Sequence, residues 1–203
     1  LRDLLLRNET LQLIDLSDND FIGYTGGLVV AEGIARNSGL QELNLSRNRF
    51  NSQSTEGIFE ALGRNGMILR LILHDVAIPR NDSAALLRQT FQGSMLQTID
   101  LGSNPLGEQD IEMLAQGLRD NRMLRRLYLQ GLGLCNESLL LIGEALTVNT
   151  TLEFLDVKEA YSFYQRSIIR NRLDDVGIRA FLRLLPRMHG LKELHGLSIT
   201  NEE

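Results

Sequence analysis

Leu96-Gln97-Thr98-Ile99-Asp100-Leu101-Gly102-Ser103-Asn104-Pro105-Leu106 places apolar residues at fixed intervals. The same spacing returns along the chain, and each copy opens with an apolar residue, at position 11, 40, 68, 96, 124 or 152. Consecutive openings are 29, 28, 28, 28 and 28 residues apart. Self-similarity at such a period is typical of stacked repeats. The sequence therefore predicts an array of similar units without one central core.

Each unit carries two hydrophobic periodicities. In the unit that opens at Leu96, Ile99 and Leu101 are two residues apart, which indicates a short strand with one buried face. Three apolar residues within 111–118 follow at spacings of three and four, which indicates a helix with one apolar stripe. Identical strand–helix units place successive strands side by side and parallel, with the helices on the other side. Because a helix is wider than the strand spacing, such a stack curves.

The predicted fold is an α/β solenoid over residues 1–203, a curved right-handed stack of six to seven repeats of 28 residues. A parallel sheet forms its concave face and helices form its convex face. We expect strands centred near residues 14, 43, 71, 99, 127 and 155, and helices over Thr25–Asn37, Thr55–Asn65, Asp82–Gln92, Glu108–Asn121, Glu137–Asn149 and Asp174–His189.

Four local features refine these boundaries. Ser54 and Asn136 are expected as helix N-caps. Pro186 should kink or shorten the last helix because its ring and missing N–H are incompatible with a helix interior. Thr90 occupies a position of the third helix where the repeat has Leu. The chain opens inside a helix without a polar end cap, so we expect further repeats or another domain to precede Leu1.

Asparagine recurs eight residues after the opening residue, at Asn19, Asn48 and Asn104. A buried Asn in a turn can bond the backbone of its own and neighbouring turns, so we expect these residues to stack as a ladder. Val76 and Leu132 interrupt the ladder, and their turns must be satisfied by other partners, for instance by water. Two Asn-x-Ser/Thr sequons, at Asn8 and Asn149, fall on another repeat position, which favours a structural role over glycosylation.

These motifs resemble the ribonuclease-inhibitor-like class of leucine-rich repeats. The residues that carry the match are Asn8-Glu9-Thr10-Leu11 with Asp15-Leu16-Ser17-Asp18-Asn19, Asn149-Thr150-Thr151-Leu152, and Gly107-Glu108-Gln109-Asp110-Ile111 before Leu114-Ala115. The class includes ribonuclease inhibitor, the Ran GTPase-activating protein and the sensor regions of NOD-like receptors. The resemblance implies the fold but not one function, because folds of this kind host many functions.

Composition excludes several partners. Lys and Arg number 21 against 26 Asp and Glu, for a net charge of −5, so the chain has no basic footprint for nucleic acid. No apolar run approaches the length of about 18 residues that a membrane helix needs, and we expect no membrane partner. Cys135 is the single cysteine, which excludes an internal disulfide and favours a reducing, cytoplasmic location. We expect its thiol to be buried.

The sequence offers no catalytic constellation. His74, His189 and His195 lack metal-ligand spacing, and no Gly-rich phosphate loop is present. We therefore predict no enzymatic activity, no metal and no cofactor.

The concave face is the predicted contact surface for a protein partner. Its side chains stand two, four and six residues after each opening residue, and they mix Arg, Tyr, Phe and carboxylates, which are typical of interfaces. The alternative is an ordinary solvated face. The predicted contact residues are Arg70, His74, Arg126, Tyr128, Phe154, Asp156 and Lys158.

One unit breaks the period. The distance from Leu152 to Leu191 is 39 residues instead of 28, which places an insert of 11 residues near 160–170 and aligns Asn171 with the asparagine ladder. Tyr161, Phe163 and Tyr164 make the insert aromatic. It either binds the partner, as loops on rigid scaffolds often do, or is a tolerated loop that folds back onto the array.

The sequence thus predicts a non-enzymatic scaffold for protein–protein interaction. Two alternatives remain open: a regulator of a small GTPase, and a structural spacer or sensor region of a cytoskeletal or NOD-like-receptor assembly.

Overall fold

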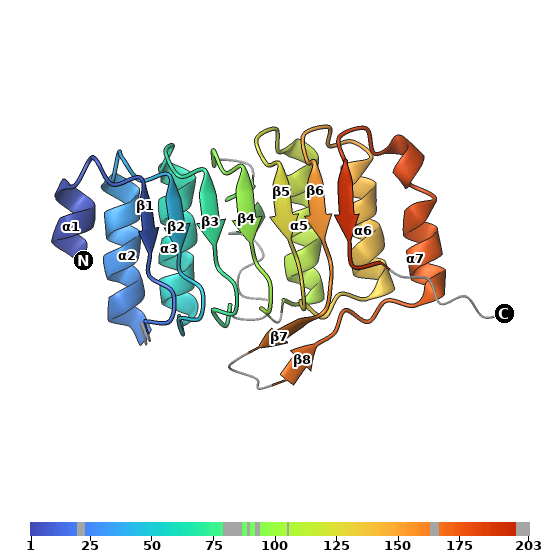
Figure 1. Cartoon of the computed structure of the whole chain (residues 1–203), viewed down its shortest axis with the longest axis horizontal. Helices are drawn as coiled ribbons and strands as arrows, with labels where there is room; N and C mark the ends of the chain where they lie inside the picture. Colours follow the sequence, from blue (N-terminus) through green and yellow to red (C-terminus); the bar gives the residue numbers. More distant parts are fainter. Residues whose placement is uncertain are drawn as a thin grey trace.

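A computed structural model describes residues 1–19, 23–78, 87–88, 90–91, 94–104, 106–162 and 167–197. Seven strands of three residues form one parallel sheet in chain order (Figure 1). Ile14 pairs with Leu43, Leu43 with Leu71, and the register continues through Ile99, Leu127 and Leu155, as the period predicts. The strands are β1 (Leu13–Asp15), β2 (Glu42–Asn44), β3 (Arg70–Ile72), β4 (Thr98–Asp100), β5 (Arg126–Tyr128), β6 (Phe154–Asp156) and β9 (Glu193–His195).

The helices line the other side of the sheet (Figure 1). Their positions confirm the predicted alternation, with ends that differ by one to several residues. They are α1 (Arg2–Arg7), α2 (Gly23–Arg36), α3 (Ser52–Arg64), α5 (Glu108–Asp120), α6 (Asn136–Leu146) and α7 (Asp175–Leu182). The predicted helix Asp82–Gln92 lies mostly outside the described residues, but Leu87, Arg88, Thr90 and Phe91 are helical. In the described part of the chain, no helix is both long and apolar enough to cross a bilayer.

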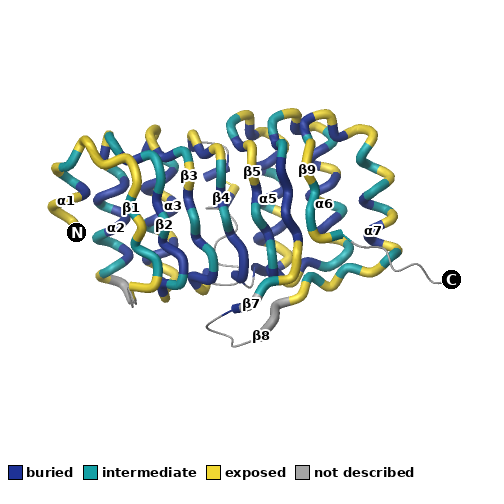
Figure 2. The backbone as a smooth tube through the Cα atoms, viewed as in Figure 1, coloured by how far each residue is buried: buried dark blue, intermediate teal, exposed yellow. Residues whose placement is uncertain are grey.

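The apolar side chains of strands and helices meet in one continuous core between the two layers. Leu71, Ile99 and Leu127 on neighbouring strands are fully buried, as are Leu114 and Leu118 on α5. Buried segments recur along the strands and the helices (Figure 2). Burying one such side chain contributes about 1.5–3 kcal/mol. The stack is thus held by contacts between each unit and its neighbours.

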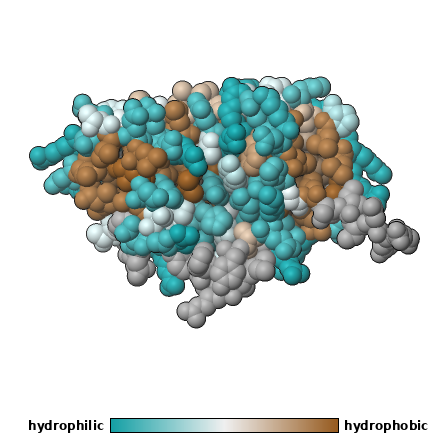
Figure 3. All heavy atoms as spheres, viewed as in Figure 1, coloured by the Kyte–Doolittle hydropathy of each residue, from teal (hydrophilic) through white to brown (hydrophobic). Residues whose placement is uncertain are grey.

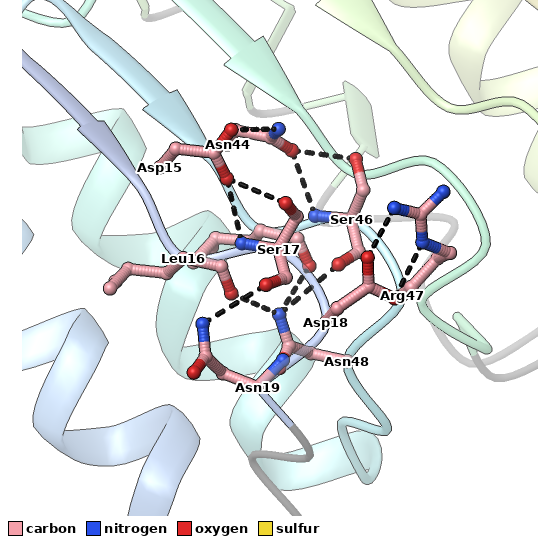
Figure 4. Close-up of polar contacts among 10 residues, drawn as sticks. Asp15, Leu16, Ser17, Asp18, Asn19, Asn44, Ser46, Arg47 and Asn48 are labelled. Carbon is pink, nitrogen blue, oxygen red and sulfur yellow. Dashed lines mark hydrogen bonds and ion pairs between the residues drawn. The ribbon is translucent and has the colours of Figure 1, made fainter.

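A ladder of buried asparagines joins the turns that follow the strands. The Asn48 amide donates to the carbonyls of Leu16, Leu45 and Ser46, and its Oδ1 accepts from the Asn19 N–H (Figure 4). Each rung therefore bonds its own turn and the turn of the preceding repeat. This confirms the predicted ladder, which continues through Asn104 and, after the insert, Asn171.

The sequence did not reveal a second ladder at the other end of the helices. The Asn65 amide donates to the carbonyls of Ile34 and Asn37, and the Asn149 amide donates to those of Leu118 and Asn121. Each Oδ1 accepts N–H groups of the loop before the next strand. For example, the Leu152 N–H donates to Oδ1 of Asn149. This position is the one shared by the sequons Asn8 and Asn149, and the structural role expected of both is confirmed.

In the two turns without asparagine, backbone N–H groups bond to the asparagine of the following repeat, as the Leu134 N–H does to Oδ1 of Asn171 at 2.9 Å. The N–H groups of Val76 and Ile78 donate to Oδ1 of Asn104, one repeat further on. In both turns an additional residue has positive φ, Ala77 at 57° and Gly133 at 76°. The missing rung is therefore compensated by a different backbone conformation and by the asparagine of the following turn.

The structure corrects two predicted helix caps and the predicted burial of the Cys135 thiol. Asn51, not Ser54, caps α3, and its side chain accepts the Ser54 N–H at 2.9 Å. Cys135 stands at the N-cap of α6, one residue before Asn136, and its thiol is only partly buried. Pro186 shortens the last helix as expected, since α7 ends at Leu182 and a separate 3-10 turn covers Leu185–Arg187.

The insert folds into an antiparallel hairpin of β7 (Ala160–Ser162) and β8 (Ser167–Ile169), below the carboxyl ends of the parallel strands (Figure 1). Ser162 is fully buried and its Oγ donates to Oδ1 of Asp75 at 2.7 Å, 87 residues away in sequence. The hairpin thus reaches from the sixth strand back to the turn of the third. Phe163 and Tyr164 lie outside the described residues, as does the side chain of Tyr161.

Candidate functional site

The candidate site is the strand face, the side of the sheet that points away from the helices and the predicted concave surface. The structure places all seven predicted contact residues there, but with unequal access. Arg70, Arg126 and Lys158 are exposed, and His74 and Tyr128 are partly exposed. The remaining two are buried, Phe154 with 7% and Asp156 with 5% of its surface exposed.

Three rings and one guanidinium stack across β5, β6 and β9, and we call these four residues the aromatic cluster. The Tyr128 and Phe154 ring centroids are 4.8 Å apart, and those of Phe154 and His195 are 5.0 Å apart. Arg126 Cζ lies 5.5 Å from the Phe154 centroid. Such contacts stabilise tilted ring pairs and cation–π pairs by about 0.5–1.5 kcal/mol each. Phe154 is therefore the buried support of a surface formed by its neighbours.

A polar network follows at the carboxyl ends of the same strands. Gln130 Nε2 donates to Asp156 Oδ2 at 3.3 Å, and Lys158 Nζ lies 3.8 Å from that oxygen. Lys158 Nζ also lies 3.2 Å from His195 Nδ1, which accepts when the imidazole is neutral. This network orients Lys158 and links it to the aromatic cluster through His195.

Carboxylates and amides in the fourth position after each opening residue have a structural task. Asp15, Asn44, Asp100 and Asp156 each accept the backbone N–H two residues ahead, at 2.8–3.0 Å. The Ser17 hydroxyl and N–H groups hold the pKa of the Asp15 carboxyl below its usual value of 3.8. These side chains therefore close the turns after the strands.

His74 lies between Ser103 and Asp100 with the connectivity of a hydrolytic triad. Its Nε2 is 3.2 Å from Ser103 Oγ and its Nδ1 is 3.4 Å from Asp100 Oδ1. Ser103 is 1% exposed, so its hydroxyl is not accessible to a substrate carbonyl. Gly102 provides the space for the imidazole, because a Cβ there would lie 2.6 Å from His74 Nδ1. The arrangement fixes the His74 ring rather than activating a nucleophile.

Five of the seven predicted residues lie together on the strand face, and His74 lies apart from them between Asp100 and Ser103. Arg126, Tyr128, Phe154, Asp156 and Lys158 lie together at the aromatic cluster and its polar network. Arg70 is separate, and its guanidinium lies 3.9 Å from the Glu42 carboxylate.

Two features of the strand face were absent from the predicted contact set. His195 is the third ring of the aromatic cluster, at the same repeat position as Tyr128. Leu13 is 57% exposed and borders an open hollow of about 210 Å³ together with Arg70 and Ile72. Apolar side chains gather at this amino-terminal end (Figure 3).

Within the described residues, no group of three or more His, Cys, Asp or Glu side chains could hold a metal ion. The groups that this face presents are stacked rings, exposed cations and carboxylates that bond turn N–H groups.

Comparison with known proteins gives consistent matches. Two family models, both described as leucine-rich repeat, match residues 7–31 and 39–64. The sequence is 24% identical over 159 residues to "NACHT, LRR and PYD domains-containing protein 13" of Homo sapiens, which covers 78% of this chain. The chain spans only 14% of the length of that relative.

Comparison with solved structures gives likenesses at low sequence identity. The tropomodulin C-terminal domain of Caenorhabditis elegans superimposes with a TM-score of 0.52 at 15% identity, covering 93% of this chain and 90% of that one. A structure titled "Leiomodin-1 Actin-Binding Site 2 (ABS2)" gives a TM-score of 0.49 at 16% identity, over 92% of this chain and 86% of that one. At these identities the likeness concerns the fold.

Proposed function

We propose that the chain, a strand–helix solenoid in which two segments match leucine-rich-repeat models, is a non-enzymatic interaction scaffold that binds a protein partner on its strand face. The proposed contact centres on the aromatic cluster and extends to Lys158 and to the hairpin β7–β8, which begins two residues later. The observation that carries the proposal is the cluster itself. Phe154, packed against three neighbours, holds Arg126 and Tyr128 in fixed positions on an otherwise regular sheet.

Such an arrangement suits recognition for an energetic reason. Tyr and Arg dominate interface energetics when they are fixed before binding, because less side-chain entropy is then lost. The turn-closing carboxylates and the buried asparagines keep the backbone beneath the cluster rigid. A rigid support positions binding groups more accurately than a loop does.

A pull-down with the array as bait tests the proposal. The strand-face variant Arg126→Ala/Tyr128→Ala leaves Phe154 in place and should lose the partner. The matched control Leu141→Ala/Val148→Ala removes exposed apolar side chains from the α6 segment on the opposite side and should retain it. Deleting residues 160–170 measures what the insert contributes. Undiminished recovery with the strand-face variant rejects the proposed surface.

A second candidate function is that of a sensor region in a NOD-like-receptor assembly. The identity to "NACHT, LRR and PYD domains-containing protein 13" over most of this chain favours it. In that case the strand-face variant should alter the oligomeric state of the longer protein that contains the array, measured by light scattering. The regulator of a small GTPase makes a different prediction, since Arg126→Ala would then slow GTP turnover in a reconstituted assay.

A further inference from the structure

We propose that the aromatic cluster recognises a peptide segment of the partner through a side-chain carboxylate, with the Arg126 guanidinium and the Tyr128 hydroxyl as its two donors. The inference rests on the proposed function, because it names the chemistry that the strand face selects.

Arg126 differs from the other cations of the sheet by its lack of a counter-charge. Within the described residues, no carboxylate oxygen lies within 4.0 Å of its guanidinium. Five other cations on or beside the strands form ion pairs with acidic side chains: Arg47 with Asp18, Arg70 with Glu42, Arg125 and Lys192 with Glu153, and Lys158 with Asp156. The residues paired with Arg126 on the adjacent strands are neutral, Thr98 on β4 and Phe154 on β6.

The Arg126 guanidinium is exposed, but its contact with the Phe154 ring restricts its position. Its Cζ lies 5.5 Å from the Phe154 ring centroid. A guanidinium that stacks on a ring through its flat face keeps its N–H groups available at the edge, where they can donate to both oxygens of one carboxylate. Stacking also lowers the rotamer entropy that binding must remove. The geometry therefore suits a bidentate contact.

Tyr128 supplies the second donor. It stands two residues after Arg126 on the same face of β5, about 7 Å along the strand. Its ring is fixed against Phe154, and in the part of the chain that the structure describes its hydroxyl has no hydrogen-bond partner. A segment lying across β5 can therefore meet the guanidinium with one side chain and the hydroxyl with the same or an adjacent group.

The two acidic residues beside Tyr128 are already engaged at the other end of the strands. Asp100 accepts the Gly102 N–H at 2.8 Å, and Asp156 accepts the Lys158 N–H at 3.0 Å. Asp156 is also covered, with 5% of its surface exposed. Both carboxylates thus bond turn N–H groups that lie beyond Tyr128, and neither stands opposite Arg126 in the sheet register.

Selection from a random dodecapeptide library displayed on phage tests the inference. The folded chain serves as bait and the Arg126→Gln variant serves for counter-selection. We expect enriched peptides to share Asp or Glu at one position. Replacing that residue by Asn or Gln should weaken binding to the wild type about tenfold to hundredfold in fluorescence anisotropy. The same replacement should have almost no effect on binding to Arg126→Gln, because the two groups act as a pair.

Arg70→Gln is the matched control, because Arg70 occupies the same repeat position on β3 but is paired with Glu42. Its affinity for the selected peptide should stay within about twofold of the wild type. Circular dichroism and the midpoint of thermal unfolding confirm that each variant is folded. Enrichment without an acidic residue, or equal losses in Arg70→Gln and Arg126→Gln, overturns the inference and leaves the strand-face scaffold standing. Selection that enriches no peptide also overturns the inference, whereas the strand-face scaffold is decided separately by the pull-down.

Discussion

Replacing Asn104 by Ala should destabilise the array more than any other single change in the turns. Asn104 is fully buried, and its amide donates to the carbonyls of Leu73, Leu101 and Gly102 at 2.7–3.2 Å. Its Oδ1 accepts two N–H groups of the preceding repeat. The side chain thus makes five hydrogen bonds, and alanine at this position can make none of them.

The magnitude follows from what the substitution leaves behind. The N–H groups of Val76 and Ile78 lose their acceptor, and both residues are 1% exposed. The carbonyls of Leu73 and Leu101, also buried, lose their donor, whereas the Gly102 carbonyl keeps the N–H of Asp75 at 2.8 Å. One buried orphaned group costs about 1–3 kcal/mol, so these four groups give a loss of at least about 4 kcal/mol.

Urea denaturation followed by circular dichroism measures the loss, with Asn19→Ala as the matched control. Asn19 holds the same repeat position at the exposed end of the ladder, and its amide donates only to Ser17, so its loss should stay below about 1 kcal/mol. Because repeat arrays can unfold in parts, amide hydrogen exchange at Val76 and Ile78 supplies a local measure. Equal losses for the two variants, or unchanged exchange at Val76, would refute the reasoning.

Three further perturbations test other parts of the account. Ala77→Gly should raise the unfolding free energy by about 1 kcal/mol, because Ala77 has a φ of 57°. Gly133→Ala should lower it by a similar amount through backbone strain alone, since a Cβ there meets no atom within 4 Å. Urea titration compares the two variants. Thr90→Val should stabilise by about 1 kcal/mol in a thermal melt, because the buried Thr90 hydroxyl has no hydrogen-bond partner among the described residues. Ser162→Ala should cost about 1–3 kcal/mol and speed amide exchange in β7, because it removes a buried donor to the Asp75 carboxylate.

The period of the sequence was sufficient to predict the sheet. Strands with a buried face every 28 residues have one way to satisfy their edges, which is to pair in parallel with the next unit. Both ends of the register, at Ile14 and Leu194, follow this rule. The same logic placed Asn171 in the ladder across the insert, because the turn needs the amide at that point whatever precedes it.

Helix caps were less predictable because several residues near each helix start could serve. Asn51 and Ser54 are both good caps, and only the backbone path decides that Asn51 accepts and Ser54 donates. The hairpin was missed for a related reason. Its position is fixed by a contact between Ser162 and Asp75, which no local pattern in the sequence reveals.

The sequence predicted which residues form the site but not how deeply each side chain is buried. Alternation along a strand shows which face a side chain occupies, and it placed Arg126, Tyr128 and Phe154 together. It does not show that neighbouring strands cover Phe154, or that His195 completes the stack. These facts depend on side-chain packing between strands, where ring size and rotamer decide which residue becomes the support.

The demands of the repeat itself indicate where specificity can reside. The eighth position is reserved for the asparagine ladder, the fourth closes the turn in most units, and the seventh adopts positive φ in five successive turns, from Asp18 to Gly131. The second position of each unit carries no such demand and presents its side chain on the strand face. Its occupants in six of the units are Glu42, Arg70, Thr98, Arg126, Phe154 and Glu193. Because the backbone does not dictate these residues, they can vary to suit a partner. Among the cations at this position, Arg126 is the one without an ion pair to any described residue.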